Sequence, residues 1–116
     1  MNLAHQVRKT ILELASEDAH GSWELWGAVQ QDALQGTESL DTLKKVFLEE
    51  IEVLIKEKKM VSFHHEESTN LYKEVPLDIS RLWFELEHAK NPQTDAYYWF
   101  GASETGKEED RRLRSQ

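Results

Sequence analysis

The chain has 116 residues and carries 22 acidic against 14 basic side chains, which gives a formal net charge of −8. That charge disfavours a nucleic-acid partner, because polyanions are bound by clusters of Lys and Arg. The chain has no cysteine, which excludes disulfide frameworks, thiolate zinc sites and cysteine nucleophiles. No apolar run is long enough for a membrane span or a signal peptide. We therefore expect no membrane partner and a cytoplasmic location.

The first half of the chain predicts three helices. Residues 2–17 carry apolar side chains at helical spacing and predict the first. Ser22 can cap a second helix, for which Gly36 is a plausible C-terminal stop. Ser39 can cap the third and strongest helix, whose apolar stripe predicts an end near Lys59.

The hydrophobic period changes after the third helix. Residues 61–65 alternate between apolar and polar like a strand, and residues 71–75 can return as the second strand of a hairpin. Asp78 can then cap a fourth helix. That helix should stop at Asn91, because Pro92 disfavours helical geometry in the residue before it.

The last part of the chain predicts a third strand and a tail. The aromatic run at residues 97–100 is most simply a short strand, and residues 107–116 are almost wholly charged or polar. We expect one globular domain over residues 1–106, followed by a frayed tail. Three helices, a hairpin, a fourth helix and a third strand predict a mainly helical α+β fold. Its element order resembles that of a winged-helix domain.

Two sequence patterns suggest sites that the chemistry does not support. The two His and two Glu at residues 64–67 suggest a metal site, but along a strand each face offers only two ligands. Residues 101–107 match the start of a phosphate-binding loop, yet Glu108 stands where Ser or Thr should hold magnesium. Because no nucleophile or acid–base pair is recognisable either, we expect no metal, no cofactor and no enzymatic activity.

The aromatic residues separate into two groups. Trp26, Phe47, Phe63 and Trp83 lie on apolar stripes, which predicts that they belong to the core. Adjacent residues in the run 97–100 must point to opposite faces of a strand. One side of that run is therefore either covered by helices or free as a contact surface, and the sequence leaves both interpretations open.

Four segments of the chain resemble a bacterial family known as domain of unknown function 596. They are residues 21–26, 47–55, 57–60 and 98–101, and the likeness covers about residues 20–106. Lys58 stands where the family usually has Gly, so the end of the third helix is expected to differ. The resemblance implies a small bacterial cytoplasmic protein and supplies no catalytic residue.

The expected function is the non-catalytic binding of another protein. Trp and Tyr dominate protein contact surfaces, and an acidic surface gains a faster association rate with a basic partner. Small acidic domains of this size resemble immunity proteins, which block a co-produced toxin, so a basic toxin domain is one partner that the charge favours. The expected contact residues lie at the hairpin tip and around the aromatic run. They are Glu66, Glu67, Asp95, Tyr97, Trp99 and Glu104.

The alternative function is that of a winged-helix regulator that binds nucleic acid. Such a protein needs a basic third helix in the major groove. Here that helix and its exit mix lysines with as many carboxylates, as on a solvated helix face. The sequence leaves open the identity of the partner, the face that binds it and the oligomeric state.

Overall fold

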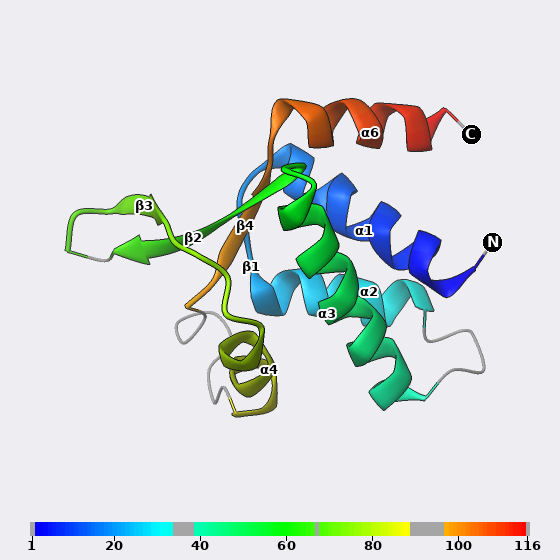
Figure 1. The fold of residues 1–116 in the computed structure, drawn as a ribbon, viewed down its shortest axis with the longest axis horizontal. Coiled ribbons are helices and arrows are strands. Elements are labelled where there is room, and N and C mark those ends of the chain that lie inside the picture. Colours follow the sequence, from blue (N-terminus) through cyan, green and yellow to red (C-terminus); the bar gives the residue numbers. More distant parts are fainter. Residues whose placement is uncertain (1, 34–38, 67, 89–96, 116) are drawn as a thin grey trace.

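The computed structural model describes residues 2–33, 39–66, 68–88 and 97–115, which form five helices and four strands (Figure 1). In chain order they are α1 (Leu3–Glu17), β1 (His20–Gly21), α2 (Ser22–Ala33), α3 (Leu40–Lys56), β2 (Met60–Glu66), β3 (Leu71–Glu74), α4 (Ile79–His88), β4 (Trp99–Ala102) and α6 (Glu104–Arg114). This architecture confirms the predicted α+β fold, mainly helical with one hairpin.

Polar side chains start four of the described helices by accepting hydrogen bonds from free backbone N–H groups of the first turn, and three of these caps precede α1, α3 and α4. Asn2 accepts from the backbone of His5 at 2.8 Å before α1. Ser39 accepts from Thr42 at 3.2 Å before α3, and Asp78 accepts from Ser80 at 3.0 Å before α4. The caps predicted at residues 39 and 78 are therefore confirmed.

Two predicted helix boundaries differ from the structure. Ser22 is the first residue of α2, directly after β1, and does not precede the helix as a cap. The helix α3 ends at Lys56, three residues before the predicted end, because Lys58 adopts a left-handed φ of 60° that ends the helical path. The predicted stops at Gly36 and Asn91 lie outside the described residues.

The four strands form one antiparallel sheet with the order β1-β4-β2-β3. The order α1-β1-α2-α3-β2-β3 is the winged-helix-like order that the sequence predicts, with a short β1 that its two residues do not signal. The late strand β4 lies between β1 and β2. The β2–β3 hairpin extends beyond the helices, and β3 is an edge strand (Figure 1).

The core lies between the helices and one face of the sheet. On β2, Met60 is buried; on β4, Phe100 and the preceding Tyr98 are also buried. The helices α1 and α3 pack against β4 and β2. Fully buried side chains of these helices, among them Ile11, Phe47 and Ile51, complete the core. The aromatic run therefore supplies part of the core, as one of the two interpretations expects.

The prediction of a frayed tail at residues 107–116 is wrong, because residues up to Arg114 belong to α6. This helix lies against α1 (Figure 1). Ser103 caps it by accepting a hydrogen bond from the backbone of Gly106 at 3.2 Å. Leu113 and the carboxylate of Asp110 are buried in its contact face. The tail thus forms an integral part of the domain.

Two predictions about aromatic residues also need correction. Trp83 is 43% exposed on α4, where Lys44 lies over its ring at 4.3 Å, so it does not belong to the core. Phe63 is only half-buried, because it lies on the face of the sheet opposite Met60. The strand predicted at residues 97–100 corresponds to β4, which begins at Trp99, two residues after the predicted start.

Candidate functional site

The sheet has an inner face with buried side chains that pack on the helices and an outer face whose side chains from β2, β3 and β4 are half-buried or exposed. Side chains alternate between the two faces along each strand. Ser62 is buried opposite Phe100 on the inner face, and the next pair in register is Phe63 opposite Trp99 on the outer face. Tyr72 lies opposite His65 and Glu74 opposite Phe63. The outer face consists of Val61, Phe63, His65, Tyr72, Glu74, Trp99 and Gly101, with the buried Gly21 of β1 beside Trp99.

Four ring side chains gather on the outer face, and we call Phe63, His65, Tyr72 and Trp99 the ring cluster. Tyr72 is at its centre, with ring centroids 4.8 Å from His65, 5.7 Å from Trp99 and 6.4 Å from Phe63. The rings of His65 and Trp99 are 6.1 Å apart. One of these four pairs is tilted and three are edge-on, and edge-on packing is an arrangement that aromatic rings prefer.

The hairpin turn sets the register of the ring cluster. Asn70 adopts a φ of 56°, a left-handed conformation that Asn tolerates better than most residues. Its side-chain oxygen lies 2.9 Å from Nε2 of His65, which ties the turn to β2. The pairing of His65 with Tyr72 follows from this short turn. Tyr72 remains 46% exposed, so the cluster is a surface and not a second core.

An open hollow of about 760 Å³ lies beside the end of β3. Val61 and Glu74 line it from the sheet, Val75 and Leu77 from the connection to α4, and Ile55 from α3. Val61 and Glu74 also belong to the outer face, but Met60 and Ser62, which line the hollow too, belong to the inner face. The hollow therefore lies at the free edge of β2, where it borders both faces of the sheet.

Tyr97 lies apart from the ring cluster, although only one residue separates it from Trp99. Its ring stacks on His64 with the centroids 4.1 Å apart, and the guanidinium carbon of Arg81 lies 3.5 Å from the ring centroid. Since His64 is on the inner face of β2, Tyr97 is held on the opposite side of the sheet from Trp99. The two residues that the sequence predicts as one contact patch therefore belong to two places.

A buried carboxylate fixes the backbone of Tyr97. Glu85 is 8% exposed, and its Oε1 accepts hydrogen bonds from the backbone N–H of Tyr97 at 2.5 Å and from the hydroxyl of Ser22 at 3.1 Å. Its Oε2 is buried and has no hydrogen-bond partner in the described part of the chain. Burial raises the pKa of this carboxyl above its usual range, since the charged form loses its hydration.

Replacing Glu85 with Gln is expected to leave the protein at least as stable at neutral pH, because the buried charge disappears while Oε1 still accepts its hydrogen bonds. With its pKa raised, folded Glu85 binds a proton before the unfolded chain does. As the pH falls from neutral toward the ordinary pKa of Glu, the free energy of unfolding of the wild type therefore rises relative to that of the E85Q variant. Urea titrations at several pH values measure this difference, and a difference that does not change with pH would contradict it.

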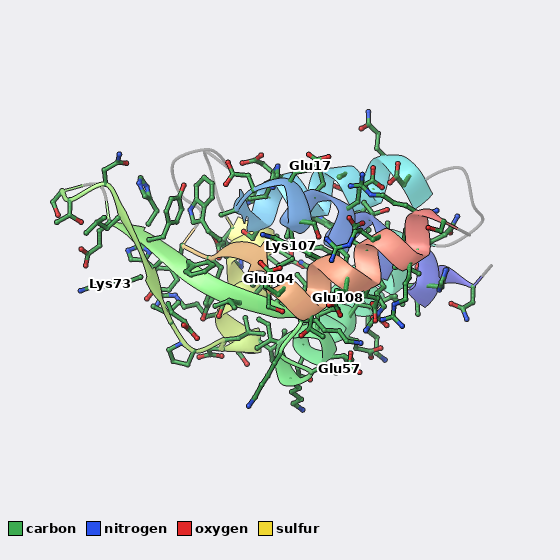
Figure 2. All side chains as sticks on the ribbon, turned by 90° about the horizontal axis from the view of Figure 1, so that it is seen from above. Glu17, Glu57, Lys73, Glu104, Lys107 and Glu108 are labelled. Atoms are coloured by element: carbon green, nitrogen blue, oxygen red, sulfur yellow. The ribbon has the colours of Figure 1, made fainter. Side chains whose placement is uncertain are left out.

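The structure does not bring Glu66 and Glu104, two further predicted contact residues, together. Glu66 ends β2 and is paired with Lys73 at 3.2 Å, while Glu104 starts α6 and is almost fully exposed. Figure 2 shows Lys73 at the hairpin and Glu104 on α6, away from the hairpin. Glu67 and Asp95 lie outside the described residues. Of the four predicted positions that the structure describes, only Trp99 belongs to the ring cluster.

Three members of the ring cluster were missed as site residues. The sequence places Phe63 in the core, suggests His65 only as a metal ligand and indicates for Tyr72 only a place in the second strand of the hairpin. The sequence feature that could identify these three residues is the alternation of residues 61–65 and 71–75. Pairing the predicted strands through a short turn places Phe63, His65 and Tyr72 on one face.

The patterns that suggested a metal or a phosphate site have structural roles. His64 and His65 point to opposite faces of β2, as the alternation predicts; His64 stacks on Tyr97, and His65 packs at a tilt against Tyr72. In the ranges that the structure describes, no three His, Asp or Glu side chains converge to hold a metal. Gly106, from the phosphate-loop pattern, lies inside α6 against the backbone of Lys59.

The exposed side of α3 bears on the nucleic-acid alternative. Lys45 and Lys56 are exposed on this helix, together with Asp41 and Glu49 and the following Glu57. Lys44 is buried and paired with Glu87 of α4, so it is not available for a phosphate. An exposed helix face of mixed charge gives no electrostatic preference for a polyanion.

No family model, curated protein or solved structure matches the chain in comparisons with known proteins. The resemblance to domain of unknown function 596 stays a prediction. Among the described helices, none has both the length and the apolar character that a bilayer span requires.

Proposed function

We propose that this chain is a non-catalytic module that binds another protein through the outer face of its sheet. The observation that carries the proposal is the ring cluster, in which half-buried Phe63, His65 and Trp99 surround the exposed ring of Tyr72. Exposed aromatic side chains that already contact one another lose little conformational freedom on binding, so they are effective contact residues.

The net charge of −8 favours a basic partner, because opposite charges accelerate association and disfavour other acidic proteins. A basic toxin domain that is co-produced with this chain in the cytoplasm fits these properties. The chain would then act as an immunity protein that covers part of the toxin surface. Size, acidity and the ring cluster support this finer proposal.

Calorimetric titration with the protein encoded beside this chain in its native genome tests the proposal. Replacing Trp99 with Ala is expected to weaken binding by about 2 kcal/mol, or about thirtyfold, because an aromatic residue near the centre of an interface contributes that much. Phe84→Ala is the matched control, since Phe84 is 62% exposed on α4 and lies outside the ring cluster. This control is expected to bind within about twofold of the wild type.

Each outcome of this titration has a defined meaning. Absence of any binding by the wild-type chain contradicts the proposed function. Binding that is weakened by Phe84→Ala and not by Trp99→Ala contradicts the assignment to the outer face. Circular dichroism of both variants checks that the fold is retained, so that lost affinity reports the contact itself.

The second candidate is the nucleic-acid-binding winged helix, which the element order α1-β1-α2-α3-β2-β3 favours. It predicts duplex binding whose affinity falls steeply as salt rises. A gel-shift titration at low salt without any shifted band would remove this alternative. The mixed charge on the exposed side of α3 makes it the weaker of the two.

A further inference from the structure

We infer that the partner contributes an extended, cationic segment that adds to the free edge of β3 as a fifth strand, with its basic side chains over the ring cluster. This inference rests on the proposed protein-binding function and specifies its mode. It follows from three features of the hairpin: an open backbone edge, an aromatic face beside that edge, and a charge that favours cations.

The open edge is the first feature. β3 is the outermost strand, and all four of its residues are exposed. The backbone N–H of Val75 donates to the carbonyl of Ser62 at 3.0 Å. This bond shows which residues of β3 direct their backbone groups toward β2 and which direct them away. Because backbone groups alternate in direction along an antiparallel strand, those of Lys73 point toward β2, and those of Tyr72 and Glu74 point outward. These outward groups can pair with an added strand.

The aromatic face beside this edge is the second feature. Tyr72 and Glu74 also direct their side chains to the outer face, next to His65 and Phe63 in the register. An added strand would therefore lay alternate side chains beside the ring of Tyr72 and the carboxylate of Glu74. A guanidinium or ammonium group in that position lies near an aromatic ring and an opposite charge at once, two interactions that favour a cation.

Charge selects the occupant and is the third feature. Two copies of this chain would each bring a net charge of −8, so edge-to-edge pairing between copies is opposed by repulsion. A cationic segment is attracted by the same charge. Beyond Glu74 the hollow lined by Val75, Leu77 and Ile55 can take an apolar side chain from the segment. The occupant is therefore a strand that alternates basic and apolar residues.

An NMR titration with defined peptides tests this inference. The probe is a blocked hexapeptide of alternating Arg and Val, and its counterpart carries Glu in place of Arg. We expect saturable shifts of the backbone amides of residues 71–75 and of the Trp99 indole with the Arg peptide alone. Raising the salt from about 50 to about 500 mM should weaken this binding by about fivefold or more.

Two variants at one position separate backbone pairing from charge. Glu74→Ala removes the carboxylate and keeps the outward N–H, so it should weaken peptide binding by about threefold. Glu74→Pro also removes the outward N–H, and the fold tolerates proline there because that N–H does not pair with β2. The proline variant should bind about tenfold more weakly than the alanine variant. Unchanged amide shifts of α1 and α3 verify the fold of both variants.

The other outcomes overturn the inference. These are absence of peptide binding, shifts on α4 or α6 without shifts in residues 71–75, or equal affinities of the two Glu74 variants. A dimer of the chain alone that Glu74→Pro dissociates would assign the edge to a second copy and overturn it as well. If the neighbouring gene's product still binds in a Trp99-dependent manner, the proposed function survives these results. Failure of that product to bind removes the function itself.

Discussion

Replacing Gly106 with Ala is expected to lower the free energy of unfolding by about 3 kcal/mol, because the added Cβ has no room. It would lie 2.0 Å from the carbonyl oxygen of Lys59 and 3.0 Å from the carbonyl carbon. The obstructing atoms belong to the backbone between α3 and β2, where Lys59 accepts a hydrogen bond from Ser103 and so cannot move freely. α6 would have to shift away from this backbone. Urea denaturation of the variant measures the loss.

Gly27→Ala provides the matched control for this prediction. Gly27 lies inside α2, and a Cβ added there meets nothing within 4 Å. The change should raise the free energy of unfolding by about 0.5–1 kcal/mol, because Ala is the better helix former. Equal effects of the two substitutions would mean that α6 does not pack closely on the segment at Lys59.

Replacing Arg8 with Met is expected to lower the free energy of unfolding by about 3 kcal/mol, because it leaves partly buried carboxylates without their main partner. Arg8 of α1 contacts Glu109 of α6 at 2.6 Å, Glu57 after α3 at 2.7 Å and Glu50 of α3 at 3.4 Å. Met keeps much of the apolar stem, so the effect reports the charge. Arg111→Met on α6 is the control, because it removes the same charge at an exposed position. It should lower the free energy of unfolding by less than about 0.5 kcal/mol.

This ion-pair network also predicts how stability depends on pH. The hydrogen bonds from Arg8, and then those from Lys59, lower the pKa of Glu109 from about 4.5 to about 2. Because its pKa is lowered, ionised Glu109 stabilises the folded state at pH values above the ordinary pKa of Glu. This contribution is lost as the pH falls toward 2. The stability difference between the wild type and the R8M variant should therefore shrink between about pH 5 and pH 2. A difference that stays constant over this range would show that Glu109 is not stabilised by Arg8.

The helices that have an apolar stripe and a polar cap could be predicted from the sequence. Ser39 and Asp78 cap α3 and α4 because their side chains compete well for free N–H groups, a local property. The hairpin also follows from local pattern, since residues 61–65 alternate and Asn70 permits the turn. These features depend on residues close in sequence, which is why the sequence alone predicts them.

The helix α6 could not be predicted, because its stabilising contacts are distant in sequence. It has few apolar residues, and Glu109 is held by Arg8, a residue 101 positions away. The close approach at Gly106 depends on Lys59. A segment rich in charge predicts fraying when its partners are unknown. Here α1 and the exit from α3 supply those partners.

The candidate site was only partly accessible for a similar reason. Alternation in the aromatic run correctly separates Tyr98 and Phe100 from Trp99, but the neighbours of Trp99 come from the hairpin. The same alternation places Tyr97 on one face with Trp99. His64, Arg81 and Glu85 hold it elsewhere. Sheet order decides the composition of the outer face, and β4 enters the sheet between β1 and β2.

Amide hydrogen exchange of the chain with and without the neighbouring gene's product is the most direct measurement of the central claim. Binding through the outer face predicts slower exchange in residues 71–75 and around Trp99. Exchange in α4, including the exposed Phe84, should not change. Slowed exchange confined to α4 or to the exposed side of α3, with residues 71–75 unaffected, would contradict the claim that this face of the sheet binds the partner.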